Sequence, residues 1–375
     1  MIRKIWLFPL LAAVFLLCSC WDLVEIEDHA FILGIGIDKA ERPDTIKVTF
    51  QIALTQAFGG EASSDTDAVW NVEVMAEDMR GAQAELLKTV NLQPTLEHCQ
   101  ILLFGEAYAR QGLKENLDYF FRNPRARLRT TVAVVQGEAS NALEIQPKTT
   151  KTSARYLRDI IMTNGKDNFE INQYNDIASI ERNTFRGSSI TLPRIIPGDD
   201  KVIVTGAAAF NEEYKLTGWY SGEEAEGIAW IRGDFQRGSI SIRTPDTLGS
   251  IAVLYVFHAT SSLKPEFRDG QLIAKNNINI EGDIIEFKKR VHGITLKELN
   301  HLEELFEKEI GKKIRHGFLK ARDEFKQDHI EFDNKVMNYF PRYWEEHHDE
   351  WNGIFQNVDL DLKVNVRIRR MGDIR

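Results

Sequence analysis

The chain has 375 residues, with 47 Lys or Arg, 56 Asp or Glu, and a formal net charge of −9 at pH 7. Nucleic acids are bound mainly through basic side chains that neutralise phosphates, so this acidic balance argues against a nucleic-acid partner. Hydrophobic residues make up 43% of the chain, and its length exceeds the roughly 300 residues that one core usually holds. We therefore expect at least two domains.

The first residues have the pattern of a bacterial signal peptide. Arg3 and Lys4 precede an apolar run over residues 5–17, which is too short to span a membrane permanently. Removal of residues 1–19 would leave 45 basic against 56 acidic residues, a net charge of about −11. The sequence has no second apolar stretch of membrane length, so any action across a membrane would require partners.

The end of the apolar run predicts a lipid anchor. Leu17-Cys18-Ser19-Cys20 fits the lipobox of bacterial lipoprotein precursors. Cleavage before Cys20 puts the small Ser19 at the scissile position, whereas cleavage before Cys18 would put the bulky Leu17 there. We therefore predict cleavage between Ser19 and Cys20, with a diacylglyceryl thioether and an N-acyl chain such as palmitate on Cys20. These acyl chains would anchor the protein stably, and no other cofactor is predicted.

The N-terminal half predicts alternating strands and helices. Strands are expected at residues 31–38, 46–54, 69–76, 98–104 and 128–135, and helices at 78–90, 106–121 and 156–163. The first two strands form a hairpin, and the small polar residues at 58–67 form a loop. Strands separated by helices suggest α/β crossovers. We place a domain boundary near Pro197, giving an N-terminal domain at 20–197, of one or two lobes, and a C-terminal domain at 198–375.

The C-terminal half predicts an antiparallel sheet packed by a long helix. Strands are expected at residues 202–210, 216–220, 239–242, 251–257 and 272–280. Apolar residues at steps of three and four from Leu296 to Leu319 mark one face of a helix of roughly 30 residues. Strict alternation from Val358 to Arg369 predicts a half-buried antiparallel strand. The chain as a whole is expected to be a multi-domain protein of the α+β (mixed α/β) class.

No pattern predicts a catalytic or metal site. His347 and His348 lie among acidic residues, but neighbours on a helix point about 100° apart, so we interpret them as part of a solvated charged face. His98 and Cys99 suggest a base and a thiol nucleophile, but neighbours on a strand point to opposite faces. Cys99 is interpreted as a small buried apolar residue. It would be the remaining cysteine after processing, which excludes an intramolecular disulfide.

Two further patterns have structural interpretations. Gly34 and Gly36 lie within a strand and lack the rest of a dinucleotide-binding fingerprint, so they are expected to mark a bulge or a close approach of backbones. A basic cluster between a helix end and a strand comprises Arg122, Arg125, Arg127 and Arg129. Its cations can complement helix carbonyls, or they can contact anionic lipid or a partner.

Together these residues resemble the Ger(x)C family of spore germination lipoproteins, the C subunits of nutrient germinant receptors in endospore-forming bacteria. The mature start Cys20-Trp21-Asp22, with Glu25-Ile26 and the strand from Ala30 to Asp38, is similar to that of the family. The resemblance continues through Tyr119-Phe-Phe-Arg122, Asn123-Pro-Arg-Ala-Arg127, Gly206-Ala-Ala-Ala-Phe210, Leu216-Thr-Gly218, Tyr339-Phe-Pro341, Trp344, Trp351, Phe355 and the final strand to Gly372. The sequence departs from the family at Asp328-His-Ile-Glu331, where we expect a glycine-bearing turn.

The resemblance implies a non-enzymatic subunit, anchored on the outer face of the spore inner membrane and needed for nutrient-triggered germination. Its partners would be the multi-pass membrane A and B receptor subunits, and a nutrient would be contacted at most indirectly. The resemblance assigns no ligand site to this subunit. A solute-binding lipoprotein of a membrane transporter is the alternative, because it would share the anchor and the α/β content. A cell-wall hydrolase would need convergent carboxylates or a metal.

Overall fold

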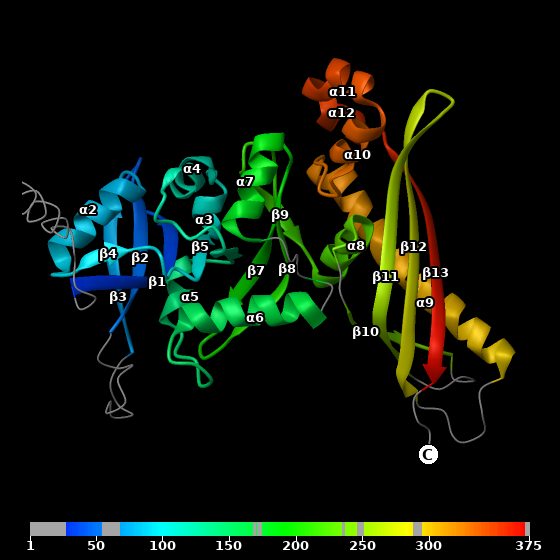
Figure 1. Cartoon of the computed structure of the whole chain (residues 1–375), viewed down its shortest axis with the longest axis horizontal. Helices are drawn as coiled ribbons and strands as arrows, with labels where there is room; N and C mark the ends of the chain where they lie inside the picture. Colours follow the sequence, from blue (N-terminus) through cyan, green and yellow to red (C-terminus); the bar gives the residue numbers. More distant parts are fainter. Residues whose placement is uncertain are drawn as a thin grey trace, which may run out of the picture.

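The structure is a computed structural model that describes residues 28–54, 68–167, 170, 175–234, 237–245, 251–287 and 295–371. The predicted signal peptide, Ser19, Cys20, the loop at 58–67 and Gly372 lie outside the described residues. Two sheets with packed helices form two domains of a mixed α/β fold, as predicted (Figure 1).

The first sheet has the strand order β3-β2-β1-β5-β6-β7-β8-β9, and β4 also pairs with β1. Its strands are β1 (His29–Lys39), β2 (Ile46–Ala53), β3 (Val69–Ala76), β4 (Gln93–Thr95), β5 (Ile101–Gly105), β6 (Thr131–Val135), β7 (Thr191–Pro197), β8 (Val202–Phe210) and β9 (Leu216–Tyr220). Strands β1, β5, β6 and β7 pair in parallel, and antiparallel strands flank them on both sides. The predicted hairpin of β1 and β2 is confirmed.

Helices cover both faces of the first sheet (Figure 1). One face carries α2 (Met79–Thr89), α3 (Glu106–Ala109), α4 (Lys114–Arg122) and α7 (Ile177–Arg186), and the other carries α5 (Ala139–Glu144) and α6 (Ser153–Asp167). Every residue of β5 and β6 is buried, which explains why these strands are continuous apolar runs. The Asp78 side chain caps α2 by accepting a hydrogen bond from the Gly81 N–H at 2.7 Å.

The helix predicted over residues 106–121 is divided into α3 and α4. Gly112 lies between them with a φ of 125°, which only glycine adopts without strain. The N–H of Leu113 then donates to the Tyr214 carbonyl at 2.9 Å instead of continuing a helix. The apolar spacing across residues 106–121 remained helical, so periodicity alone did not reveal the break.

The second sheet has the order β10-β11-β12-β13. Its strands are β10 (Gly238–Arg243), β11 (Ile251–Arg268), β12 (Gln271–Phe287) and β13 (Asp359–Met371). The helices of this half are α8 (Gly222–Arg232), α9 (Leu296–Leu319), the π-helical turn η4 (Lys320–Phe325), α10 (Phe332–Tyr339), α11 (Pro341–His347), the 3₁₀ turn η5 (His348–Glu350) and α12 (Trp351–Phe355). The predicted long helix is confirmed: Thr295 and Glu298 form a capping box before α9, and helical structure continues through η4.

The predicted antiparallel pairing of the final strand is wrong, because β13 pairs with β12 in parallel. Figure 1 shows the physical reason: α9 carries the chain back along the sheet, and α10 to α12 lie at the end where β12 begins. The chain therefore enters β13 from the same end as β12, by the kind of helical crossover that parallel strands require. Alternating polarity identifies a half-buried strand, but not its direction.

Strands β8 and β9 follow residue 197, where we expected a domain boundary, and they extend the first sheet. The core of the second half also includes Ala207, Ala209 and Tyr220 from these two strands. Helix α8 comes next in the chain and is buried around its circumference from Ala225 to Ile231. It therefore lies between the first sheet and the α9 side of the second sheet.

The backbones of α8 and α9 touch where they cross. A Cβ atom on Gly227 would lie 2.2 Å from the Lys313 carbonyl oxygen, and one on Gly317 would lie 2.6 Å from the Glu224 carbonyl oxygen. Beside this contact the Lys313 ammonium forms an ion pair with Glu226 at 2.7 Å, and both side chains are largely buried. The close approach therefore depends on the two glycines.

A buried histidine adds a polar link between the halves. The Nε2 atom of His329 lies 2.8 Å from the Phe210 carbonyl oxygen, and its Nδ1 atom lies 2.8 Å from the Tyr220 hydroxyl. Because a carbonyl can only accept, Nε2 carries the proton and Nδ1 accepts from Tyr220. Burial lowers the pKa of His329 to about 4, so the ring is neutral at pH 7.

The loop at residues 328–331 makes its tight turn without glycine. The Asp328 carboxylate accepts hydrogen bonds from the N–H groups of Phe332 and Asp333 at 3.1 and 2.7 Å, and from the Trp351 indole at 3.0 Å. Burial raises the pKa of Asp328, and the charge of Asp333 acts in the same direction. Glu331 occupies the left-handed position with a φ of 57°. A tight turn is thus formed where the resemblance led us to expect glycine.

Replacement of the strained glutamate by glycine should stabilise the protein. We expect Glu331→Gly to raise the free energy of unfolding by about 1 kcal/mol, because a left-handed conformation costs a side-chain-bearing residue about that much. Urea denaturation measures the change. Glu304→Gly, in the exposed middle of α9, is the matched control and should lower stability by about 1 kcal/mol. A loss of stability in both variants would contradict the argument.

The neutral His329 should make stability depend on pH. Its pKa is lower in the folded chain, so the unfolded chain binds more protons between pH 6.5 and 4, and stability falls as the pH falls. From pH 7 to pH 5 we expect this residue to contribute a loss of about 2 kcal/mol. His329→Gln can retain both hydrogen bonds but cannot titrate. Subtracting its profile of stability against pH from that of the unaltered protein removes the contribution of all other titrating groups. Equal losses for the two proteins in urea denaturation would exclude this role.

Candidate functional site

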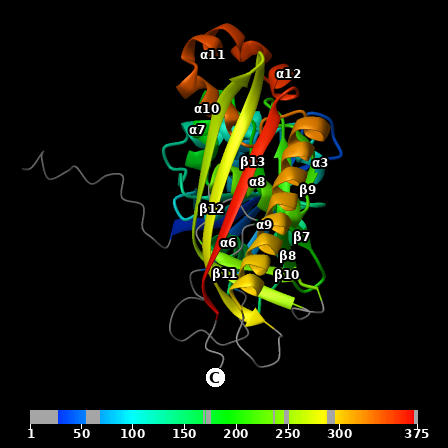
Figure 2. The same cartoon turned by 90° about the vertical axis from the view of Figure 1, so that its right-hand side faces the viewer.

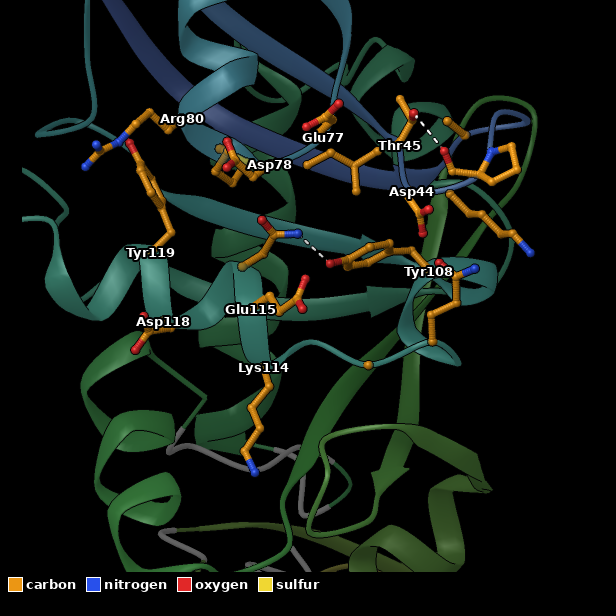
Figure 3. A pocket seen from close by; sticks show the side chains of 18 of the residues that line it. Asp44, Thr45, Glu77, Asp78, Arg80, Tyr108, Lys114, Glu115, Asp118 and Tyr119 are labelled. Atoms are coloured by element: carbon orange, nitrogen blue, oxygen red, sulfur yellow. Dashed lines mark hydrogen bonds between the residues drawn. The ribbon is translucent and has the colours of Figure 1, made fainter.

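A hollow of about 1750 Å³ lies where β1, β3 and β5 end (Figure 3). Its lining comes from four parts of the chain: the turn after β1, the start of α2, the segment from α3 to α4, and the loop before β9. In α/β sheets, binding sites commonly lie beyond the carboxyl ends of the parallel strands. The hollow is therefore the candidate functional site that the fold indicates.

Asp38 lies at the end of β1, directly before Lys39, the first residue of the chain that lines the hollow. Its buried carboxylate accepts hydrogen bonds from the N–H groups of Ala139 at 2.7 Å and Ser140 at 3.0 Å, at the start of α5. A Cβ atom on Gly105 would lie 1.9 Å from the Asp38 carboxylate, so this end of β5 has room only for glycine. Burial raises the pKa of Asp38, while the two N–H donors oppose the rise. The end of β1 is thereby fixed against β5 and α5.

Aromatic and polar side chains form the inner wall of the hollow. The Asn116 amide donates a hydrogen bond to the Tyr108 hydroxyl, which joins α4 to α3 (Figure 3). Arg80, from the first turn of α2, lies beside the Tyr119 ring of α4. Burial raises the pKa of both tyrosines, so both hydroxyls are protonated at pH 7. The wall therefore presents neutral hydrogen-bonding groups between charged rims.

The charges around the hollow balance. Seven basic and seven acidic side chains line it: Lys39, Arg42, Arg80, Arg110, Lys114, Arg122 and Lys215, and Glu41, Asp44, Glu77, Asp78, Glu115, Asp118 and Glu213. Some pair along one element, as Arg122 does with Asp118 at 2.7 Å and Lys215 with Glu213 at 2.6 Å. The hollow consequently attracts neither anions nor cations as a class.

The chemical character of the lining bears on what the hollow can bind. None of the described residues that line the hollow is a histidine or a cysteine. Pockets for small molecules are mostly apolar and enclose the ligand. This hollow is wide and charged, with polar groups of both signs on its rim. Such a surface can set the orientation of a protein that docks on it.

The structure separates the suspected thiol and base. Cys99 is buried in the core of the first sheet, and burial raises the pKa of its thiol to about 12. His98 is exposed and, with Arg127, lines a second hollow of about 710 Å³. The interpretation of Cys99 as a small buried residue is confirmed. The expected bulge is also confirmed: the β1–β2 register shifts between Ile32 and Gly34. A Cβ atom on Gly34 would lie 2.9 Å from the Ala154 Cβ, so α6 packs closely against this glycine.

The adjacent histidines bond to their own helical segment. The Nδ1 atoms of His347 and His348 lie 2.9 and 3.2 Å from the carbonyl oxygens of Tyr343 and Glu345. Across the described ranges, no group of three or more His, Cys, Asp or Glu side chains is placed to hold a metal ion. None of the helices in those ranges is long and apolar enough to cross a membrane.

The four arginines of the basic cluster do not line one common surface. Arg122, Arg125, Arg127 and Arg129 are all exposed. Arg122 lies in the last turn of α4, as a cation that complements helix carbonyls would, and contributes to the first hollow, whereas Arg127 contributes to the second.

The first hollow was not predicted from the sequence, because the segments that line it are distant along the chain and come together only through the order of the strands in the sheet. The local signal was the Asp38 carboxylate at the end of an apolar strand.

The comparisons with known proteins agree with this architecture. Residues 22–197 match the family described as "Spore germination protein N-terminal domain", and residues 205–372 match "Spore germination B3/ GerAC like, C-terminal".

Individual relatives match over nearly their whole length. Spore germination protein YndF of Bacillus subtilis (strain 168) is 23% identical over 95% of this chain and 94% of its own. Spore germination protein KC of the same organism is 25% identical over 99% of this chain and 97% of its own. The crystal structure of the GerBC protein shares the fold, with a TM-score of 0.60 and 17% identity over 93% of this chain and 100% of that chain. The chain therefore belongs to the Ger(x)C family of spore germination proteins.

Proposed function

We propose that this protein is the lipid-anchored C subunit of a nutrient germinant receptor, with an assembly or sensing role and no catalytic step. One observation carries the proposal: both domains of the family match, in order, along nearly the whole chain. In this role Cys20 carries the lipid that holds the two domains on the extracytoplasmic face of the spore inner membrane. The multi-pass A and B subunits are its partners, and a nutrient is contacted at most indirectly.

We assign the charged hollow at the ends of β1, β3 and β5 to contact with one of these partner subunits. Its open shape suits an inserted protein segment, and rims with balanced charges favour a partner with a matching pattern of both signs. The end of β1, from which the lining turn starts, is held in place because Asp38 bonds to the start of α5. A charged surface can select a partner's orientation without a large apolar area.

Loss of the anchor should release the protein and impair germination. In the producing spore-former, we expect Cys20→Ala to leave the membrane fraction and to reduce the response to nutrients, because uncleaved or unlipidated protein lacks the acyl chains. Fractionation and a germination assay with a panel of nutrients measure both effects. Cys18→Ala is the matched control, since alanine is small enough for the lipobox. Release from the membrane with normal germination would contradict the receptor role and favour the solute-binding alternative.

Reversal of a charge in the hollow should weaken assembly without unfolding the protein. Arg80 is exposed in the first turn of α2, where a glutamate is favourable to the helix dipole. We expect Arg80→Glu to co-purify with the A and B subunits at least tenfold less well, at an unchanged Tm. Arg243→Glu on β10 is the control, an exposed arginine outside the hollow. Equal recovery of partners with both variants would remove the hollow from the assembly.

A further inference from the structure

Strand β13 forms an edge of the second sheet, and α9 runs along it (Figure 2). The outer side of an edge strand presents backbone N–H and C=O groups that can pair with another strand. Proteins usually cover such edge groups with side chains or other elements. The covered positions of β13 are those at which another strand cannot pair.

Side chains cover both ends of this edge. Glu303 and Glu307, one turn apart on α9, accept hydrogen bonds from the N–H groups of Ile368 at 2.8 Å and Val366 at 2.9 Å. At the start of the strand, an Arg322 guanidinium N–H donates to the Val358 carbonyl at 3.2 Å. The edge between Val358 and Val366 lies between these two caps.

A gap interrupts the row of capping side chains. The next position one turn along α9 is Gly311, whose absent Cβ would lie 4.0 Å from the side chains of Leu362 and Val364. Backbone groups of alternate strand residues point the same way, so the N–H groups of Leu362 and Val364 face the same side as that of Val366. No described side chain or backbone group bonds to them there. A groove of about 650 Å³ occupies this position.

The groove combines apolar side chains with a basic rim. Leu319, Leu362 and Val364 contribute the apolar surface. Lys308, Lys312 and Arg315 of α9 line the same groove and are exposed, and none of the three has an ion pair with a described residue. Glu304 and Glu307 also line it, but Glu307 is occupied by the Val366 N–H. This cluster of unpaired cations contrasts with the net charge of −9 of the whole chain.

We propose that this groove receives an extended acidic segment of a partner protein, which adds a strand to β13 between Leu360 and Val364. Backbone pairing at a sheet edge supplies affinity, and alternate side chains supply specificity. Side chains of the added strand on the α9 side meet Lys308, Lys312 and Arg315, so acidic residues at every second position are the complementary pattern. The inference does not rest on the receptor assignment, because it follows from the edge and the helix alone.

Gly311→Glu tests the proposal directly. The new carboxylate would continue the row of Glu303 and Glu307, cover the open N–H and repel an acidic strand. Its Cβ has space, and glutamate is a better helix former than glycine, so the Tm should rise. The probe is a labelled synthetic peptide in which glutamate alternates with valine, bound to the full lipidated chain in detergent and followed by fluorescence anisotropy. We expect at least tenfold weaker binding by Gly311→Glu than by the unaltered chain.

Gly353→Glu is the matched control, because it adds the same side chain to a helix at an exposed glycine outside the groove. It should bind the peptide as the unaltered chain does. Two further peptides separate pairing from charge. One replaces glutamate by lysine, and the other carries an N-methyl group on every residue and so cannot pair along either edge. Both should bind at least tenfold more weakly than the glutamate peptide.

Several outcomes would overturn the proposal. The first is that the unaltered chain does not bind the glutamate peptide, or that Gly311→Glu binds it equally well. The second is that the N-methylated peptide binds equally well, which would show charge attraction without strand pairing. The third is that sedimentation of the full chain shows a dimer which Gly311→Glu converts to a monomer. The edge would then pair with a second copy of this chain and not with an acidic partner segment.

Discussion

The close contact between α8 and α9 is the constraint on which the rest of the structure depends. Because Gly227 and Gly317 have no side chains, the two helix backbones touch, and α9 can lie beside a helix that also packs on the first sheet. This placement brings the loop after α9 near enough for His329 to bond to Phe210 and Tyr220. A larger residue at either glycine would displace α9 and the strand edge beside it.

The two surfaces that we assign to partners are built on different principles. The hollow beyond β1, β3 and β5 offers side-chain charges of both signs, so it selects a partner by the pattern of that partner's charges. The groove on β13 offers backbone N–H groups beside cations, so it selects a partner segment that is extended and negatively charged. The GerBC protein shares the fold at 17% sequence identity. The same fold is therefore compatible with a different residue at most positions.

Elements marked by a regular spacing of apolar residues were predictable from the sequence. The helix from Leu296 and the strand after Val358 followed from apolar spacing, and the burial of Cys99 followed from its small apolar side chain next to an apolar run. The direction of β13 was not predictable, because alternation is the same for either direction and only the crossover through α9 decides it. The hollow was missed for a related reason: its segments are distant in sequence and meet through the strand order.

The contact between Asp38 and Gly105 has a consequence for the evolution of the family. The carboxylate occupies the space that any side chain at position 105 would need. The two positions must therefore change together: a homologue with a side chain at the equivalent of Gly105 must have lost or moved the acid at the equivalent of Asp38. It must also satisfy the first N–H groups of α5 by other means. Substitution at these positions is thus coupled through a shared volume.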